Sequence, residues 1–323
     1  MGILYHRFPN KTKVFKTGEF KQISFKDLDE INGFIVSSFD SKKEFVFVED
    51  EKAKKGMQFF FSKEEPFVIS KDRYLLVAKK FKESIIDSKI DKAILSRVKH
   101  VPLNNFNLES KFDNLCEAYP NALVYLISSE QFGTWIGATP EILLNVKAGQ
   151  VQTMALAGTK KSKTENWTNK EIDEQAYVTQ RIVEVANQFK KTYVDVSPTY
   201  TYEAGPIFHL RTNINFDIEN KNLKDLLNEL HPTPAVAGLP VEQATDLIHK
   251  EEIHQRDLYT GFLGYISEEH TSLYVNLRCA QIFEKSAYLY LGGGFTSESS
   301  VNQEWEETEN KSLTLTEVFL KNS

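Results

Sequence analysis

Two carboxylates and an ammonium near the end of the chain have the spacing of one helix face. Glu304, Glu307 and Lys311 stand at positions i, i+3 and i+7, so a helix would project all three from one side within two turns. Such a group could hold a divalent cation together with a ligand carboxylate. On a solvated helix, however, Glu307 and Lys311 would form only an ordinary surface pair. The spacing by itself leaves both interpretations open.

A glycine run and one arginine, both C-terminal, could receive an anion. Gly292, Gly293 and Gly294 follow the apolar run YLYL and predict a turn where backbone N–H groups approach a carboxylate without a Cβ in the way. A tight strand exit would use the same residues, and no Gly-Lys-Ser/Thr follows as in a phosphate loop. Arg278, within the strand-like run LYVNLRCA, needs a fixed carboxylate partner, which is either structural or a substrate.

Four other titratable residues are candidates for chemistry, and each also has a purely structural interpretation. Glu174 lies in an acidic helix start and offers the hard oxygen that Mg²⁺ prefers, or it simply complements the helix dipole. Lys92 begins an apolar run, where burial beside a ligand could make it a general base rather than a strand-edge lysine. Glu141 follows a proline in GATPEILL. His231, in HPTP, is either a ligand contact or a loop hydrogen-bonding group.

Helix-start patterns locate the elements that must carry these groups. Thr168 stands three residues before Glu171, a capping box that predicts a helix running to about Lys190. Ser300 and Gln303 form the same pattern and predict a final helix. The expected apolar face of the first helix comprises Ile172, Ala176, Ile182, Val183, Ala186 and Phe189.

Short apolar runs around these helices predict an α+β fold with large mixed, mainly antiparallel β-sheets and surrounding helices. Residues 1–90 are expected to form an N-terminal part, with strands in the aromatic runs at 44–50 and 58–70 and a helix near 72–85, but they contain no specific motif. Residues 91–323 are expected to form the catalytic region. Further helices are predicted to end at Leu230 and near Tyr259, and the final strands are expected to be antiparallel.

Bulk properties exclude several classes of function. A chain of 323 residues with 41% hydrophobic side chains can bury an enzyme-sized core. Its formal charge of -6, without a basic stripe, argues against nucleic acid as a partner. No run is long enough to span a membrane, and the chain opens without a signal-like apolar segment, so a cytoplasmic location is expected. Cys116 and Cys279 alone provide neither a disulfide framework nor a zinc-ligand spacing.

Seven blocks, taken in order, resemble those of the chorismate-binding enzymes over roughly residues 90–320. They are IDKAILSR, GATPEILL, MALAGT, HPTPAVAG, RDLYTGFLGY, LYVNLRCA and LGGGFTSESSVNQEWEETENK. Within that family, the lysine of the first block and the plain LAGT block look like isochorismate synthases. Ala157 stands where aminodeoxychorismate synthases have a nucleophilic lysine, and QRIVEVANQF replaces the RNDLGRV-like stretch of the aminating members.

The resemblance implies a reversible, Mg²⁺-dependent conversion of chorismate to isochorismate. By this resemblance, Lys92 would be the general base that activates water for attack at ring carbon 2, and Glu141 the general acid for the departing 4-hydroxyl. Glu174 and Glu307 would hold Mg²⁺ on the ring carboxylate, with Glu304 ordering the water around the ion. The family usually has Glu-His at the metal-binding helix, whereas here Gln175 follows Glu174.

The resemblance also implies how the rest of the substrate is held. Arg278, the glycines 292–294 and Lys311 would receive the enolpyruvyl carboxylate. Tyr259 and His231 would line the ring, and the backbone of Gly158 and Thr159 would close the pocket. Binding both carboxylates would orient the ring between base and acid.

Two alternatives stay open at this stage. A salicylate synthase would make isochorismate and then eliminate pyruvate, and a non-catalytic protein would only bind chorismate. Retention of Lys92, Glu141, Glu174 and Glu307 argues against the silent protein. We expect a monomer without a glutamine amidotransferase subunit, serving menaquinone or siderophore biosynthesis.

Overall fold

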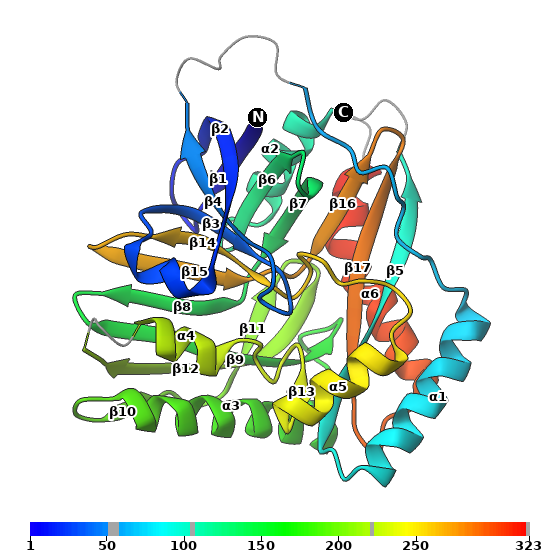
Figure 1. Cartoon of the computed structure of the whole chain (residues 1–323). Helices are drawn as coiled ribbons and strands as arrows, with labels where there is room; N and C mark the ends of the chain where they lie inside the picture. Colours follow the sequence, from blue (N-terminus) through cyan, green and yellow to red (C-terminus); the bar gives the residue numbers. More distant parts are fainter. Residues whose placement is uncertain (51–57, 104–106, 220–222, 321–323) are drawn as a thin grey trace.

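A continuous, mainly antiparallel β-sheet, called the ribbon below, forms the centre of the computed structural model (Figure 1). The structure describes residues 1–50, 58–103, 107–219 and 223–320. The strands in the first half of the chain are β1 (Gly2–Arg7), β2 (Val14–Ile23), β3 (Gly33–Ser37), β4 (Glu44–Glu49), β5 (Lys92–Pro102), β6 (Leu123–Ser129), β7 (Gly133–Thr139), β8 (Ile142–Lys147) and β9 (Gln150–Lys160). The others are β10 (Val194–Val196), β11 (Tyr200–Ala204), β12 (Ile207–Asp217), β13 (Gly238–Leu239), β14 (Phe262–Ile266), β15 (His270–Val275), β16 (Cys279–Phe283) and β17 (Ser286–Phe295).

The ribbon can be followed from one strand to the next through antiparallel pairs. From β12 it passes through β9, β8, β15, β14, β3, β4, β2, β1, β6, β7, β16 and β17 to β5 and β13. Strands β10 and β11 both pair with β12. The mainly antiparallel architecture predicted from the sequence is confirmed.

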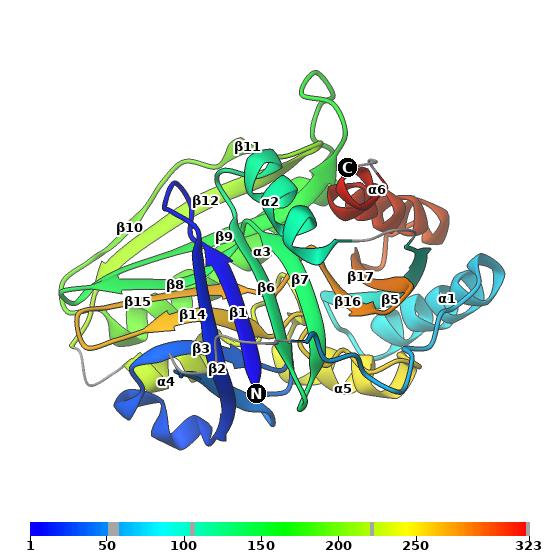
Figure 2. The same ribbon diagram turned by 90° about the horizontal axis from the view of Figure 1, so that it is seen from above.

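The ribbon folds back on itself around an aromatic core. Strands from both halves of the ribbon contribute to this core, including the fully buried Trp135, Tyr125 and Tyr290. Full burial of a large apolar side chain stabilises the fold by about 1.5–3 kcal/mol, so this interior holds the two halves face to face. Figure 2 shows the two groups of strands from above.

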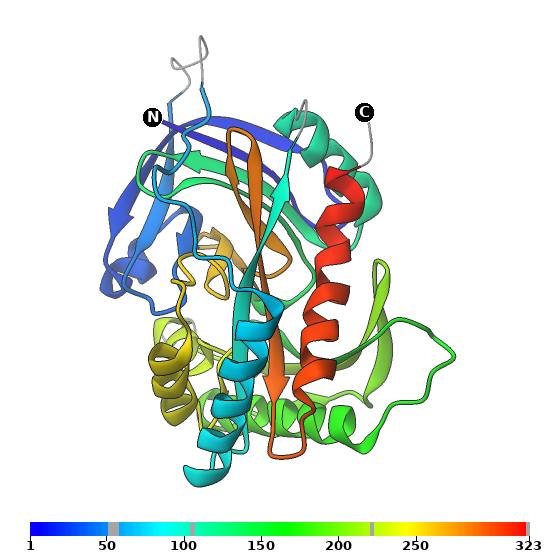
Figure 3. The ribbon, with the colours of Figure 1, turned by 90° about the vertical axis from the view of Figure 1, so that its right-hand side faces the viewer.

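Helices cover the outer faces of both halves. They are α1 (Lys71–Asp87), α2 (Leu108–Ala118), α3 (Asn169–Phe189), α4 (Leu223–Leu230), α5 (Val241–Glu251), α6 (Val301–Phe319) and the 3₁₀ helix η1 (Phe25–Glu30). Helices α3 and α4 pack on the half containing β8, β9 and β14, whereas α1, α2, α5 and α6 pack on the half containing β5 and β17 (Figures 1 and 3). None of the helices in the described part of the chain is both long and apolar enough to cross a bilayer.

Three predicted elements differ from the structure. Residues 58–70 form no strand, and at Phe60 the backbone bonds to side chains instead: Ser128 accepts from the Phe60 N–H at 2.8 Å, and Thr134 donates to the Phe60 carbonyl at 2.6 Å. Helix α5 ends at Glu251 instead of near Tyr259. Helix α6 does begin after Ser300, but that side chain makes no cap hydrogen bond.

Helix α3 begins at its predicted capping box, but only part of the predicted apolar face is buried. Glu171 accepts the backbone N–H of Thr168 at 2.8 Å, as the box requires. Ile172 is 49% exposed, and Ala176 also faces solvent. The predicted Ile182 and Ala186 are buried, and Val183 and Phe189 pack against the same core. The other buried residues of the helix are Glu174, Gln175, Val178 and Val185. The helix is therefore rotated so that Glu174 points inward, which apolar periodicity alone did not indicate.

Candidate active site

An open cavity of about 730 Å³ lies where β5, β9, β12 and β17 meet α3 and α6. A concave site lined by both apolar and convergent charged side chains is typical of small-molecule binding. The predicted site residues that line it are Lys92, Glu141, Gly158, Thr159, Glu174, Tyr259, Arg278, Gly292, Gly294, Glu307 and Lys311. Gly293, Glu304 and His231 are not among its lining residues. Tertiary structure thus brings together predicted residues from six of the seven sequence blocks.

The glycines lie inside a strand, so the predicted turn is wrong. Gly292, Gly293 and Gly294 belong to β17 and pair with Ser96, Leu95 and Ile94 of β5. Because side chains alternate across a strand, Gly292 and Gly294 face the cavity and Gly293 faces Glu304 behind it. A Cβ on Gly294 would lie 2.7 Å from Glu174 Oε1, and a Cβ on Gly292 would lie 2.8 Å from the Tyr259 hydroxyl. The missing side chains therefore create the floor of the cavity.

Lys92 and Glu141 reach the cavity from two different strand ends. Lys92 is the first residue of β5 and is buried, and its backbone pairs with Leu239 of β13. Glu141, between β7 and β8, is also buried, and Thr233 Oγ1 lies 3.5 Å from its Oε1. Burial raises the pKa of Glu141 to about 7, although the Lys92 charge opposes that rise. Glu141 can therefore carry a proton near neutral pH.

Three carboxylates within the first two turns of α3 and α6, namely Glu174, Glu304 and Glu307, form what we call the carboxylate cluster. Burial raises the pKa of Glu174, and burial together with the Glu307 charge raises the pKa of Glu304 to about 7. Burial would also raise the pKa of Glu307, but the ammonium groups of Lys311 and Lys170 lower it to about 2. Lys311 lies 2.6 Å from Glu307 and donates to the Gly292 carbonyl at 2.7 Å, while Lys170 pairs with Glu304.

Two oxygens of this cluster are free to bind a ligand. Within the described ranges, Glu174 Oε1 and Glu304 Oε2 are buried and have no hydrogen-bond partner. An unsatisfied buried acceptor costs about 1–3 kcal/mol, a cost that a bound cation or its water would remove. No three potential metal ligands are grouped into a ready-made cage anywhere in the described residues. A cation here would need substrate and water to complete its coordination, which is the usual arrangement for Mg²⁺.

Arg278 is held by a histidine that sequence reasoning missed. It lies in the bend between β15 and β16, with φ of 51°, rather than within a strand as predicted. Its Nη2 donates to His209 Nε2 at 2.9 Å, and His209 Nδ1 donates to the Gly158 carbonyl at 2.6 Å. Burial and the Arg278 charge lower the pKa of His209 to about 3, so the ring is neutral. A lone histidine in β12 carried no signal of this contact in the sequence.

His231 does not line the cavity, which corrects its predicted role beside the substrate ring. Its Nε2 donates to the Phe39 carbonyl at 3.1 Å, and its ring packs edge-on against Phe262 at 4.9 Å. Burial lowers the pKa of His231 to about 4. The structural interpretation as a loop hydrogen-bonding group is therefore the one the geometry favours.

Gln175, which stands where the resembling family usually has histidine, fastens α3 to the sheet. Its Nε2 donates to the Ala155 carbonyl at 3.1 Å and to Thr212 Oγ1 at 3.0 Å. Gly158, on the same strand as Ala155, has φ of 65°, and a Cβ there would lie 3.0 Å from Glu171 Cβ. The first turn of α3 can therefore approach β9 closely enough to place Glu174 in the cavity.

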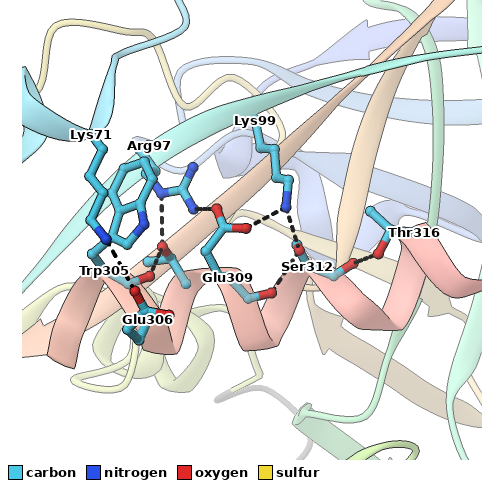
Figure 4. A network of polar contacts seen from close by, with 9 residues as sticks. Lys71, Arg97, Lys99, Trp305, Glu306, Glu309, Ser312 and Thr316 are labelled. Carbon is cyan, nitrogen blue, oxygen red and sulfur yellow. Dashed lines mark hydrogen bonds and ion pairs between the residues drawn. The ribbon is translucent and has the colours of Figure 1, made fainter. Parts of the chain in front are cut away.

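A second polar network, the β5–α6 clamp, holds the adjoining face of α6 (Figure 4). It comprises Arg97, Lys99, Trp305, Thr308 and Glu309. Arg97 lies 3.8 Å from the Trp305 ring centroid, donates to Thr308 Oγ1 at 2.8 Å and pairs with Glu309. Lys99 lies 2.5 Å from the other Glu309 oxygen. The clamp sets the position of α6 against β5, and with it the positions of Glu307 and Lys311 relative to Lys92.

Comparison with known proteins adds to this geometry. Residues 28–320 match a family model described as chorismate binding enzyme. The chain is 27% identical over 244 residues to isochorismate synthase EntC of Escherichia coli strain K12, covering 71% of this chain and 62% of that protein. It is 28% identical over 257 residues to isochorismate synthase MenF of Bacillus subtilis strain 168, covering 75% and 54%. Anthranilate synthase component 1 of Aquifex aeolicus is 26% identical, with coverage of 76% and 52%.

Solved structures share the fold. A structure titled as a putative 2,3-dihydroxybenzoate-specific isochorismate synthase, DhbC from Bacillus anthracis, superposes with a TM-score of 0.84 at 24% identity, covering 99% of this chain and 96% of that one. The menaquinone-specific isochorismate synthase MenF from Escherichia coli gives 0.83 at 21% identity, covering 99% and 89%. The matched part of this chain thus spans about half to three-fifths of the sequence relatives, but nearly all of these solved chains.

Proposed function

Because this chain belongs to the chorismate-binding enzyme family, we propose that it converts chorismate to isochorismate, reversibly and with Mg²⁺. The observation that carries the proposal is the placement of Lys92 and Glu141 on one cavity with two further cationic side chains, Arg278 and Lys311, and with Glu174 and Glu307 of the carboxylate cluster. The relatives named isochorismate synthase support it. The anthranilate synthase match is of similar identity, so the reaction type rests on the acid–base pair and on QRIVEVANQF, which replaces the RNDLGRV-like stretch of the aminating members.

The cavity suits a dianion with two separated carboxylates. Arg278 and Lys311 offer fixed positive charge at one side, beside the floor of β17. His209 holds the Arg278 guanidinium in place, so little ordering is needed when a carboxylate arrives. The enolpyruvyl carboxylate is proposed to bind here, and Tyr259, which stacks on Tyr290 with ring centroids 5.6 Å apart, would line the ring.

In the proposed reaction the base acts on the incoming water and the acid acts on the departing hydroxyl group. Lys92 would accept a proton from water as the water oxygen bonds to ring carbon 2. The ring double bond shifts, the bond between carbon 4 and its hydroxyl breaks, and Glu141 donates the proton that lets this group leave as water. One water enters and one leaves, so the two isomers have equal composition and should be close in free energy. The protonated state of Glu141 near neutral pH supports this assignment.

Magnesium fits the carboxylate cluster. Glu174 and Glu307 would hold the ion, and Glu304 would accept from its water, since Glu174 Oε1 and Glu304 Oε2 lack partners in the described structure. When bound, the ion would supply positive charge for the ring carboxylate. Burial raises the pKa of Glu174 and Glu304, and the lysines beside the cluster oppose that effect and keep Glu307 ionised.

The test is to incubate the purified chain with chorismate and Mg²⁺ and to identify the products by mass and absorbance. Isochorismate without pyruvate is expected, with no requirement for glutamine or ammonia, and added isochorismate should return chorismate. Stoichiometric pyruvate with salicylate at neutral pH would replace the proposal with a salicylate synthase. Binding without turnover would indicate a non-catalytic chorismate-binding protein.

A further inference from the structure

Lys170 lies where a helix disfavours a positive charge. It is the second residue of α3, and the N-terminal end of a helix carries partial positive charge that destabilises a cation. Its side chain is also only 24% exposed. A lysine in this position needs compensation from elsewhere in the fold.

The compensation comes from the carboxylate cluster. Lys170 Nζ pairs with Glu304 Oε1, and the Glu304 side chain is 1% exposed. The two residues are 134 positions apart in the chain, and their pair forms where the first turns of α3 and α6 meet (Figure 3). Lys170 also acts on Glu174 and Glu307, whose pKa values it lowers relative to burial alone.

The charges near the cluster are therefore partly balanced before any ligand binds. Three carboxylates face the ammonium groups of Lys170 and Lys311, and the charge of Lys92 also acts on Glu174. Lys311 already has a place in the proposed function, because it lines the cavity and can reach a substrate carboxylate. Lys170 is not among the residues that line the cavity, so its charge acts on the cluster from behind.

We propose that Lys170 neutralises the carboxylate cluster in the free enzyme and so weakens its affinity for a divalent cation until an anionic ligand is present. This inference rests on the proposed function, in which Mg²⁺ binds Glu174 and Glu307. A divalent ion entering next to an ammonium experiences repulsion that burial strengthens. The two charges of a dianionic substrate offset the excess positive charge of the ion and the ammonium group. The ion and the substrate therefore favour each other's binding, and linkage requires this effect to be reciprocal.

The experiment measures Mg²⁺ affinity by isothermal titration calorimetry on chelator-treated protein, with and without chorismate. Lys170→Met should bind Mg²⁺ about tenfold more tightly than wild type when chorismate is absent, because one repelling charge is gone. With chorismate the difference should shrink. Lys170→Arg keeps the charge and should stay within about twofold of wild type.

Lys71→Met is the matched control. Lys71 of α1 pairs at 3.2 Å with Glu306, which lies on α6 near Glu304. Both side chains of this pair are exposed, at 48% and 61%, and neither lines the cavity. Its removal should leave Mg²⁺ affinity unchanged. In thermal unfolding without metal, Lys170→Met should melt at a lower temperature than wild type, and Mg²⁺ should raise its melting temperature by more than it raises that of wild type.

The outcomes separate this inference from the proposed function. Equal or weaker Mg²⁺ binding by folded Lys170→Met, with wild type binding normally, would overturn the role of Lys170 and leave the magnesium proposal intact. Absence of Mg²⁺ binding by wild type, even with chorismate, would overturn both. Tighter binding by Lys71→Met as well would show a general charge effect and would also overturn the specific role.

Discussion

Charged groups of strand β5 and helix α6 come together in two places, and their surroundings differ between the two. At the β5–α6 clamp, Arg97 and Lys99 share the carboxylate of Glu309, and each also donates to a hydroxyl group of α6. At the cavity end of the same two elements, Lys92 and Glu307 line an open space, and Glu304 keeps a buried oxygen without a partner in the described structure.

The paired groups of the clamp stabilise the fold, whereas the groups at the cavity are available to bind a ligand. Satisfied buried polar groups add rigidity, whereas an unsatisfied one costs free energy and is retained where a ligand satisfies it. Changes at the clamp should therefore alter stability more than catalysis. Changes at the cavity should do the reverse.

Removal of divalent cations should have the largest effect on activity and none on the clamp. Excess EDTA is expected to abolish conversion of chorismate, because the carboxylate cluster would then repel the ring carboxylate, and added Mg²⁺ should restore it. The measurement is isochorismate formation, with the near-ultraviolet circular dichroism spectrum recorded on the same samples. Full turnover in excess EDTA would contradict the assignment of a metal to the cavity.

Loss of the proposed base or acid should come next. Lys92→Ala and Glu141→Gln should each lower kcat by roughly 10²–10⁴-fold, because each removes one proton transfer from the transition state. Lys99→Ala, on the same strand but in the clamp, is the control and should keep kcat within about twofold. Near-normal turnover in either cavity variant, with its mass confirmed, would reject that residue's role.

The pH profile should sharpen the assignment of Glu141. Since it must donate a proton, it has to be protonated, and a pKa of about 7 keeps it so below pH 7 and ionises it above. We therefore expect kcat/KM to fall about tenfold per pH unit on the alkaline side. Glu141→Gln should lose this limb, and Lys99→Ala should retain it. An unchanged alkaline limb in Glu141→Gln would show that another group titrates.

Breaking the clamp should have the smallest effect on activity. Arg97→Met removes a buried guanidinium and leaves Glu309 paired only with Lys99, so the free energy of unfolding should fall by about 2 kcal/mol. The value of kcat should change by less than about fivefold, because α6 keeps its apolar contacts through Leu315, Val318 and Phe319. Urea unfolding and steady-state kinetics measure the two effects. A loss of kcat as large as that of Lys92→Ala would mean that the clamp is part of the catalytic machinery.

Much of the site was predictable because its residues repeat within single elements. The helical spacing of Glu304, Glu307 and Lys311 placed them on one face, and the box at Thr168 placed the start of α3. The position of Lys92 at the start of an apolar run was also visible in the sequence. Periodicity describes which side chains share a face, and it does so from local geometry alone.

What periodicity could not supply was which partner each face meets. Tertiary structure rotated α3 so that Glu174 turned inward and Ile172 outward, and it placed Gly292–Gly294 in a strand whose two faces serve different residues. It also buried His231 against Phe39 while bringing His209 to Arg278. The pair of Lys170 and Glu304 joins residues 134 positions apart. Such contacts depend on how separate elements pack, and burial then decides which charged groups are paired and which stay free for a ligand.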